Sequence, residues 1–319
     1  MRRVLGFVLL GLGAFLLVAA VMVRFYAYPN LAVAPIDQNS VTDLEAEGAT
    51  IFDTGTLEEI TTDLDVASRT VGDVEGTEDA GDDIRVWVST TTIRTSDGTV
   101  VSQSTERSPF DATSGEAVNC CGAFDEVAQG DRVEVKREGL IFKFPFNTKK
   151  QAYQWWDGTL NDTVEAEYQG EDEIEGLKVY VFKTEVPRTQ VGTRTLPASL
   201  LGEEGDGEIE AETMYQDTKT MYVEPETGAV LHRTEDVVNS YAVGGEDRIT
   251  ATEATISYTA DQVKRNADDQ RSNASSLGLA RGPLPIGLGV AGLLGLLAGL
   301  LLVRQPATGR TSDEDFEDQ

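Results

Sequence analysis

The sequence predicts a mainly β protein: a curved antiparallel sheet, an open barrel or a sandwich of about ten short strands with few short helices, flanked by an N-terminal and a C-terminal transmembrane helix. Three observations predict this class. An apolar run of about twenty residues lies near each end of the 319-residue chain. Between the runs, short segments that alternate apolar and polar residues are separated by turn residues. No apolar period of the helical type runs through this middle region.

The first apolar run, Val4 to Val23, carries no charge and follows Arg2 and Arg3. As a helix it would rise about 30 Å, the thickness of the hydrocarbon core of a bilayer. It is longer than the apolar part of an ordinary signal peptide, so we expect an uncleaved signal anchor. Arg24 and three aromatic residues then form an expected interfacial belt, and Pro29 is expected to end the helix.

Strands and turns fill the middle region, which we expect to fold as one β-rich domain. A lead-out with weak strand character, 30–48, comes first. The clearest hairpin signals are the turns at 96–98, 175–176 and 224–228. The expected loops are 69–83, 110–130 and 197–207. The expected strands are 49–65 (one or two strands), 84–88, 99–102, two strands within 131–146, 163–168, 177–186, 210–223, 229–238 and 248–258.

The second strand within 131–146 carries the densest group of aromatic side chains. Alternation places Leu140 and the three phenylalanines up to Phe146 on one face, and Pro145 indicates an edge strand or a strand end. The stretch 147–157 is expected to form a short helix or a turn. This aromatic group favours a hydrophobic core, and the alternative is a groove for a lipid or another apolar ligand. The residues assigned to the groove are Phe142, Phe144, Phe146, Tyr153 and Trp156.

Charges around the two runs predict that both termini lie in the cytoplasm and that the central domain is extracytoplasmic. Two arginines precede the first run and two follow the second, as the positive-inside rule requires, although one arginine on the other side of each run opposes it. The predicted segments are a cytoplasmic N-terminus at 1–3, a transmembrane helix at 4–23, the β-rich domain at 24–260, a polar stalk at 261–283, a transmembrane helix at 284–303 and an acidic cytoplasmic tail at 304–319.

Small side chains recur in the second run, from Leu284 to Val303. They indicate a ridge that packs closely against another helix, which would belong to the first span, a second copy or another envelope protein. The residues of this ridge, spaced four apart, are Gly287, Ala291, Gly295 and Gly299.

Acidic residues outnumber basic ones by 55 to 26, and the formal net charge is −29 at pH 7. This balance argues against nucleic acid as a partner and against a face that lies on anionic lipid. It is typical of a solvated surface, with a cation-binding surface as the alternative. The alternating carboxylates of a calcium loop are absent, so we predict no metal and no cofactor.

Cys120 and Cys121 are the only cysteines, and they are adjacent. The sequence leaves three interpretations open: buried thiols, a vicinal or intermolecular disulfide, and chemically active thiols. His232 is the only histidine, and no nucleophile motif such as G-x-S-x-G accompanies it. We therefore predict no catalytic residue and no enzymatic activity.

Three stretches resemble a known family: FKFPFNTKKQAYQWWDGTL (142–160), EYQGEDEIEGLKVYVFKTEVPRT (167–189) and MYVEPETGAVLHR (221–233). They are similar to an actinobacterial, membrane-anchored family of unknown function that carries the label porin-A-like. The resemblance covers nearly the whole chain and implies a span at each end of a β-rich exported region. It transfers no catalytic residue, and the family label implies a channel. GLKVYVF and the turn at 224–228 are also similar to lipoprotein-carrier folds, whose curved sheet holds acyl chains.

The main expectation is a non-enzymatic envelope membrane protein whose β-domain binds or transfers an apolar or lipid component, or acts as an assembly scaffold. Its expected partners are membrane lipid and, through the second span, a second copy or another envelope protein, but not nucleic acid. A channel-forming, porin-like protein is the alternative, and a hydrolase comes third.

Overall fold

The computed structural model describes residues 1–127, 130–205 and 207–304, and these residues form two compact units. The first unit combines residues 1–31 with the chain from Ser276 onward, and the second comprises residues 32–275. Of the acidic tail predicted at 304–319, only Arg304 belongs to the described residues, and the rest lies outside them.

The first unit is helical and contains both predicted spans. α1 (Arg2–Met22), η1 (Val23–Ala27) and α2 (Tyr28–Leu31) form one helical stretch of 30 residues. α4 (Ala260–Arg281) and α5 (Pro283–Arg304) form a second stretch of 45 residues, which begins in the other unit. Both stretches are long and apolar enough to cross a membrane, so they indicate membrane association.

The first helix continues past Pro29, where the sequence predicted its end. Proline has no N–H group to donate to the preceding turn and normally breaks a helix. Here the turn before it is a π-helix, in which the backbone N–H of Tyr28 donates to the carbonyl of Val23. This wider turn accommodates the proline, and the helix ends at Leu31.

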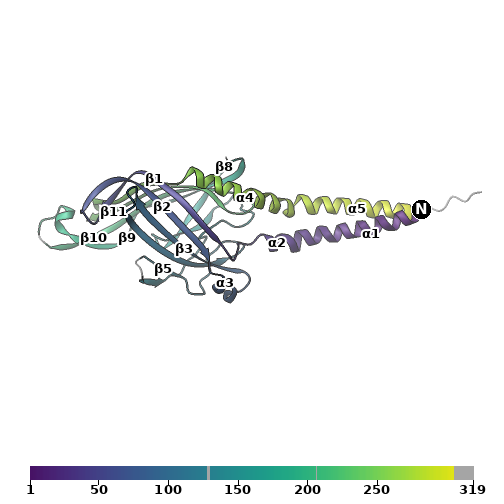
Figure 1. The fold of residues 1–319 in the computed structure, drawn as a ribbon, viewed down its shortest axis with the longest axis horizontal. Coiled ribbons are helices and arrows are strands. Elements are labelled where there is room, and N and C mark those ends of the chain that lie inside the picture. Colours follow the sequence, from purple (N-terminus) through teal and green to yellow (C-terminus); the bar gives the residue numbers. More distant parts are fainter. Residues whose placement is uncertain (128–129, 206, 305–319) are drawn as a thin grey trace, which may run out of the picture. The chain divides into compact units, whose positions relative to one another are not determined.

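The second unit is built on one antiparallel sheet of twelve strands, which confirms the predicted fold class (Figure 1). The strand order is β6-β5-β4-β3-β2-β1-β12-β11-β10-β9-β8-β7, so most strands pair with their neighbours in sequence and β1 pairs with β12. The strands are β1 (Asn39–Asp53), β2 (Glu58–Gly72), β3 (Ile84–Thr95), β4 (Val100–Asp111), β5 (Phe124–Glu126), β6 (Arg132–Glu134), β7 (Tyr153–Asp157), β8 (Asp162–Ile174), β9 (Leu177–Pro197), β10 (Glu208–Val223), β11 (Val230–Val243) and β12 (Glu246–Tyr258). A short η2 helix (Ala198–Leu201) connects β9 to β10.

Alternating side chains give the sheet a buried face and a solvent face. In β2, the buried Leu64 and Val66 alternate with the exposed Asp63 and Asp65. The predicted turn at 175–176 closes the β8–β9 hairpin, and both of its residues have positive φ, at 49° and 76°. Such a turn matches the twist of the two strands, so it fixes their register.

Two short segments connect the ends of this sheet. Among the described residues, no ladder joins the edge strands β6 and β7. Isolated bridges instead lead from β4 to β7, and they pair Phe110 with Ala117, Glu116 with Leu140, and Leu140 with Trp155. The sheet is therefore open, but the bridges through residues 116–117 and Leu140 link β4, near one edge of the sheet, to β7 at the other edge.

The stretch 140–157 differs from its prediction. The strand expected from Leu140 to Phe146 is reduced to the bridge at Leu140, because the N–H groups of Phe144 and Phe146 donate to the carbonyls of Gly228 and Thr113. The short helix or turn expected at 147–157 is partly wrong: its second half is β7. Aromatic side chains fit a half-buried strand, and β7 contains three of them.

A helix stands where the sequence predicted only the loop 69–83. β2 extends to Gly72, and α3 (Val74–Ala80) follows. Asp73 caps α3, because its Oδ1 accepts a hydrogen bond of 2.9 Å from the N–H of Gly76. The Gly- and Asp-rich composition that suggested a loop thus includes the cap of a short helix.

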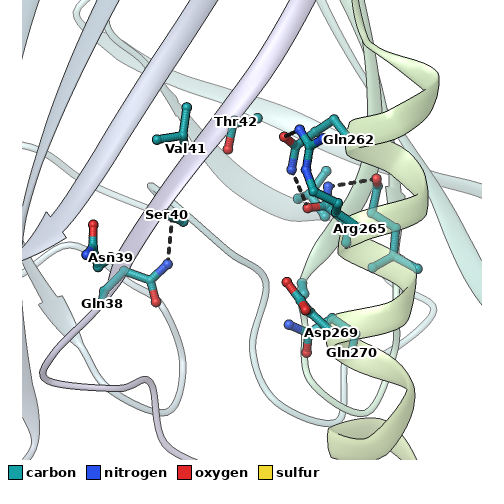
Figure 2. Close-up of a pocket in the computed structure, with 13 residues that line it drawn as sticks. Gln38, Asn39, Ser40, Val41, Thr42, Gln262, Arg265, Asp269 and Gln270 are labelled. Atoms are coloured by element: carbon teal, nitrogen blue, oxygen red, sulfur yellow. Dashed lines mark hydrogen bonds between the residues drawn. The ribbon is translucent and has the colours of Figure 1, made fainter.

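The strand β12 ends earlier than its two neighbours. Its last residue, Tyr258, pairs with Leu44, so the first five residues of β1 extend beyond it. α4 begins at Ala260 and passes this part of the sheet, where Gln262 of the helix lies near Thr42 of the strand (Figure 2). A helix therefore continues the chain where a strand would otherwise complete the sheet.

Candidate functional site

The two apolar helices α1 and α5 pack through glycine residues. A Cβ atom added to Gly13 would lie 2.7 Å from the carbonyl oxygen of Gly292, and one added to Gly299 would lie 2.8 Å from the carbonyl oxygen of Gly6. Real Cβ atoms do not approach backbone this closely, so only glycine allows this contact. We call Gly6, Gly13, Gly292 and Gly299 the glycine seam.

The ridge predicted on the second span overlaps this seam only in part. Gly299 belongs to the seam, and a Cβ on Gly295 would contact the backbone of Gly13 at 3.3 Å. Gly287 has nothing within 4 Å, and Ala291 is exposed. A four-residue spacing drifts around a helix by about 40° per step, whereas seven residues make nearly two whole turns. The seam follows the seven-residue spacing on both helices, which the sequence reading missed.

The aromatic residues of the predicted groove fall into separate clusters. Phe144 is fully buried, and its ring stacks on Phe182 and Trp155 at centroid distances of 4.5 and 5.3 Å. Tyr153 meets Phe144 edge-on at 5.4 Å. These ring contacts are worth about 0.5–1.5 kcal/mol each beyond the area they bury. The rings fill one another's space, so an apolar ligand would have to displace them.

The other members of the predicted groove lie elsewhere. Phe142 packs with Trp87 and Phe110 at centroid distances of 5.4 and 5.5 Å. Phe146 lies under Lys143, and Trp156 is buried on the opposite face of β7 from Trp155. The structure therefore brings Phe144 and Tyr153 together and separates them from the other three.

Lys143 is a buried cation in this region. Its Nζ lies 3.7 Å from the centroid of the Phe146 ring and has no hydrogen-bond partner among the described residues. Burial lowers the pKa of Lys143 to about 7, although the charge of Asp111 opposes this shift. The ring face of Phe146 and the charge of Asp111 both attract the ammonium group.

The segment that carries Phe144 docks on the turn between β10 and β11. The N–H of Phe144 donates to the carbonyl of Gly228 at 2.8 Å, and the N–H of Thr148 donates to the carbonyl of Pro225 at 2.8 Å. The turn is stiffened from within, because the buried Glu224 accepts hydrogen bonds from the N–H and the hydroxyl of Thr227. The turn predicted at 224–228 is thus also the platform for the aromatic segment.

A network of ionisable side chains lies inside the sheet. Nζ of Lys219 on β10 lies 3.5 Å from Oδ2 of Asp217, 3.5 Å from Oε1 of Glu235 and 3.9 Å from Oδ2 of Asp157. The same Asp157 oxygen accepts a hydrogen bond of 2.9 Å from the hydroxyl of Tyr215. We call Asp157, Tyr215, Asp217, Lys219 and Glu235 the ionic network.

Burial and charge oppose each other in the ionic network. Burial raises the pKa of Asp217 to about 6, against the effect of the neighbouring Lys219. Burial lowers the pKa of Lys219, but the charges of Glu235 and Asp217 outweigh it and keep the pKa above its ordinary value. Burial raises the pKa of Glu235, but Lys219 and Arg233 outweigh it and leave the pKa lowered. Asp217 is therefore the carboxylate whose ionisation is opposed by its surroundings.

The sequence reading missed the ionic network, because carboxylates are too abundant to stand out singly. A usable signal was the pairing of charges across a predicted hairpin. Asp217 and Lys219 share one face of β10, and Arg233 and Glu235 share one face of β11, with Lys219 directly opposite Glu235. Four charged residues of both signs in alternating positions of two facing strands predict ion pairs across the hairpin.

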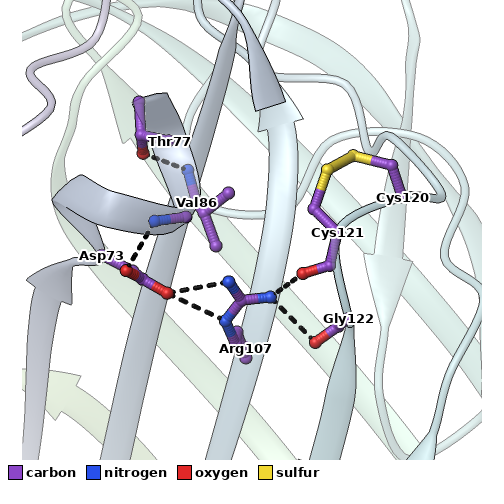
Figure 3. Close-up of polar contacts among 8 residues, drawn as sticks. Asp73, Thr77, Val86, Arg107, Cys120, Cys121 and Gly122 are labelled. Carbon is purple, nitrogen blue, oxygen red and sulfur yellow. Dashed lines mark hydrogen bonds and ion pairs between the residues drawn. A yellow bond between two sulfur atoms is a disulfide. The ribbon is translucent and has the colours of Figure 1, made fainter. Parts of the chain in front are cut away.

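The two adjacent cysteines form a vicinal disulfide (Figure 3). Cys121 has a φ of 60°, and its carbonyl, like that of Gly122, accepts a hydrogen bond from Arg107. Arg107 also forms an ion pair of 2.8 Å with Asp73, which caps α3. The N–H of Gly76, with Arg107, holds the pKa of Asp73 below its ordinary value. Of the three interpretations, the structure contains the vicinal bridge, and Arg107 connects the loop that carries it to the cap of α3.

Comparison with known proteins identifies the family. Residues 5–301 match the family described as Porin PorA, and this range covers most of both helical stretches and the whole sheet. A Porin PorA of Corynebacterium amycolatum is 24% identical over an alignment of 381 residues, which covers 94% of this chain and 98% of the relative. A Porin PorA of Corynebacterium resistens is 22% identical over 230 residues, which cover 52% of this chain and 56% of the relative. The chain belongs to the Porin PorA family.

Proposed function

We propose that this chain forms an ion-conducting channel in the cell envelope and is anchored there by its two apolar helices. The observation that carries the proposal is the family match over residues 5–301, together with a relative named Porin PorA that this chain matches over 98% of its length. Porins are not enzymes, so this membership also supports the expectation that the chain has no catalytic activity. The family implies an envelope location, and the helices suggest membrane association.

Side chains fill the interior of the sheet unit, which limits where ions could pass. Phe110, Phe144 and Phe182 are fully buried, and the ionic network occupies a further part of the interior. The solvent face carries charged residues such as Asp63 and Asp65, which a lipid-facing barrel strand would exclude. We therefore place the conducting path between several copies of the chain and not through one sheet.

The helices offer the surface for such an association. The glycine seam holds α1 against α5, and many apolar side chains of α5 remain exposed around the pair. In a bilayer these side chains contact lipid or the helices of another copy. Large exposed side chains of α5 are Ile286, Val290, Leu293, Leu294, Leu297 and Leu301.

The charge of the chain favours cations. The chain has a net charge of −29, and nearly all of its acidic residues lie in the sheet unit. This unit therefore has a negative field, which raises the local concentration of cations at the mouth of a pore. The arginines near the ends of both spans support an orientation with both termini in the cytoplasm and the sheet unit outside. The proposed channel therefore has an acidic extracytoplasmic mouth.

Planar bilayers test the proposal directly. Addition of the purified full chain is expected to produce stepwise conductance. The double variant Gly13→Leu with Gly292→Leu is expected to abolish the steps, because the helices can no longer approach. Gly11→Leu is the matched control, since a Cβ at Gly11 meets nothing within 4 Å. Absence of steps with a folded, inserted parent chain would contradict the channel.

Lipid analysis of the same preparation separates the channel from the lipid-binding role that the sequence alone suggested first. A channel requires no bound lipid in fixed proportion to the protein. Mass spectrometry that finds one tightly bound lipid per chain, combined with a silent bilayer, would support lipid binding instead. If the bilayer shows no conductance and no lipid is bound, the result would favour the assembly scaffold.

A further inference from the structure

The early end of β12 leaves part of β1 without a partner on one side. Along a strand, the backbone N–H and carbonyl groups of successive residues face opposite sides. Those of Asp43 face the side that β12 leaves open: its carbonyl accepts from the N–H of Thr259, and its N–H donates to Oε1 of Gln262 on α4. Val41 and Asn39 have the same orientation as Asp43. Among the described residues, no hydrogen bond reaches their backbone groups on this side.

Amide side chains of α4 take the place of the missing strand. Oε1 of Gln262 accepts from the backbone of Asp43 at 3.1 Å, and Nδ2 of Asn266 donates to the carbonyl of Leu231 on β11 at 3.0 Å. Gln270 continues this series of amides at four-residue spacing. Four helical residues rise about 6 Å and two strand residues about 7 Å, so the helix can present an amide to successive outward groups of the strand.

The series stops where a cavity opens. A space of about 290 Å³ lies between the first residues of β1, the start of β11 and the polar face of α4. Figure 2 shows Gln38 and Asn39 on one side of this space and Asp269 and Gln270 on the other. Within the described residues, no hydrogen bond or ion pair reaches the side chains of Asn39, Asp269 and Gln270, whereas Gln262 and Asn266 are both hydrogen-bonded.

We propose that this cavity binds an extended, neutral or basic segment of another polypeptide, which adds to the free edge of β1 as a short strand. The N–H and carbonyl of Val41 would pair with the backbone of the segment, and Gln270 would meet it from the helix side. Strand addition draws its affinity from main-chain hydrogen bonds and therefore tolerates many sequences. The lining contains both donors and acceptors, which suits a peptide backbone.

The charges of the lining and of the whole chain indicate which charge the bound segment carries. Asp269 lies in the lining, and Arg265 is neutralised by an ion pair of 2.7 Å with Asp43. The whole chain carries a net charge of −29, so an acidic segment is repelled before it arrives. A segment with lysine or arginine at alternate positions is favoured.

A short peptide of simple sequence can test the proposal, because strand addition recognises mainly the backbone of the bound segment. The fluorescent peptide acetyl-Thr-Val-Lys-Val-Thr-amide is added to the full chain in nanodiscs, and binding is followed by anisotropy. We expect saturable binding that falls at least tenfold when the peptide is N-methylated on alternate residues. A peptide with glutamate in place of lysine is expected to bind more weakly.

Two variants of the chain locate the site. Val41→Pro removes an N–H that faces the cavity and leaves the bonds from β1 to β2 in place, so the peptide should lose at least tenfold in affinity. Thr54→Pro, in the turn at the other end of β1, is the matched proline control and should bind as the parent does. Gln270→Ala, which keeps the backbone of β1 intact, should also weaken binding.

The proposal is overturned if the N-methylated peptide binds equally well, or if neither peptide binds. It is also overturned if Val41→Pro and Gln270→Ala both leave the affinity unchanged. Maltose is a further test. If maltose displaces the peptide, and if Val41→Pro does not change this competition, the cavity binds a polyhydroxyl ligand instead, which would also contradict strand addition.

Discussion

At the scale of single residues, Asp217 is the group that ties stability to pH most directly. Its pKa is raised to about 6, from an ordinary 3.8, so the folded state binds this proton more tightly than the unfolded chain does. The resulting stability is fully present below pH 3.8 and is lost as the pH rises through 6. Asp217→Asn mimics the protonated form. Its melting temperature relative to the parent should therefore rise by several degrees from about pH 4.5 to about pH 7.5. Thermal unfolding followed by circular dichroism checks this, and a pH-independent difference would show that Asp217 ionises freely.

Lys143 gives the opposite pH dependence. Its pKa is lowered to about 7, from an ordinary 10.5, so its burial opposes folding fully below pH 7 and this cost disappears as the pH rises toward 10.5. Lys143→Met keeps most of the volume and removes the charge. The variant should gain stability over the parent at about pH 6, and the gain should shrink by about pH 9. A gain that grows with pH would mean that the ammonium group is stabilised where it lies.

At the residue scale, the sequence predicted some contacts and not others. It identified Cys120 and Cys121 as a pair but left their bonding open, because adjacency permits a bridge without requiring one. It grouped Phe142 with Phe144 by strand alternation, yet the two rings lie in different clusters because the segment is not a strand. Alternation predicts neighbours only when the backbone is extended and paired.

At the scale of elements, the turn between β10 and β11 holds the aromatic segment. Gly228 has a φ of +73°, and a Cβ there would lie 2.0 Å from the carbonyl oxygen of Phe144. Gly228→Ala should destabilise the chain by about 2–4 kcal/mol, because strain adds to the clash. Gly244→Ala is the matched control, with a φ of +61° and open space, and should cost about 1–2 kcal/mol. Urea unfolding followed by tryptophan fluorescence compares them, and equal losses would show that the segment does not dock on this turn.

The glycine seam predicts a specific pairing of α1 with α5. A Cβ on Gly6 would lie 2.8 Å from the side chain of Val303, and cysteine at position 303 lacks the methyl group that makes this clash. The nearest backbone atom would then be the carbonyl oxygen of Gly299 at 3.1 Å, which a small shift accommodates. Cysteines at positions 6 and 303 should therefore cross-link in a background in which Cys120 and Cys121 are replaced by alanine. Adding Gly13→Leu should lower the cross-link yield several-fold, whereas adding Gly11→Leu should not. Mobility on non-reducing gels measures the yield. Equal yields in both variants would exclude the seam as the contact.

Local signals decided which elements were predictable. The turn at 175–176 and the hairpin around 224–228 were readable because their residues favour one backbone conformation. The bridges through residues 116–117 and Leu140 were not, since they depend on segments far apart in sequence. The extension of the first helix past Pro29 also escaped prediction, because a π-helical turn compensates for the missing N–H group.

At the scale of the whole molecule, hydropathy and alternation alone predicted the two long apolar helices and the β-rich class. The ranking of functions was less successful, because it placed lipid binding above a channel. The charged strands argue against a lipid-facing barrel, but a channel that helices anchor in the membrane does not need its strands to face lipid. The family comparison therefore favours the function that the sequence reading placed second.

The reversal potential across a planar bilayer with a steep KCl gradient tests the channel and its acidic mouth together. We predict discrete conductance steps and a reversal potential displaced toward the equilibrium potential of K⁺, because the chain carries a net charge of −29. A membrane that stays silent with the inserted chain, or a displacement toward the equilibrium potential of Cl⁻, would contradict it.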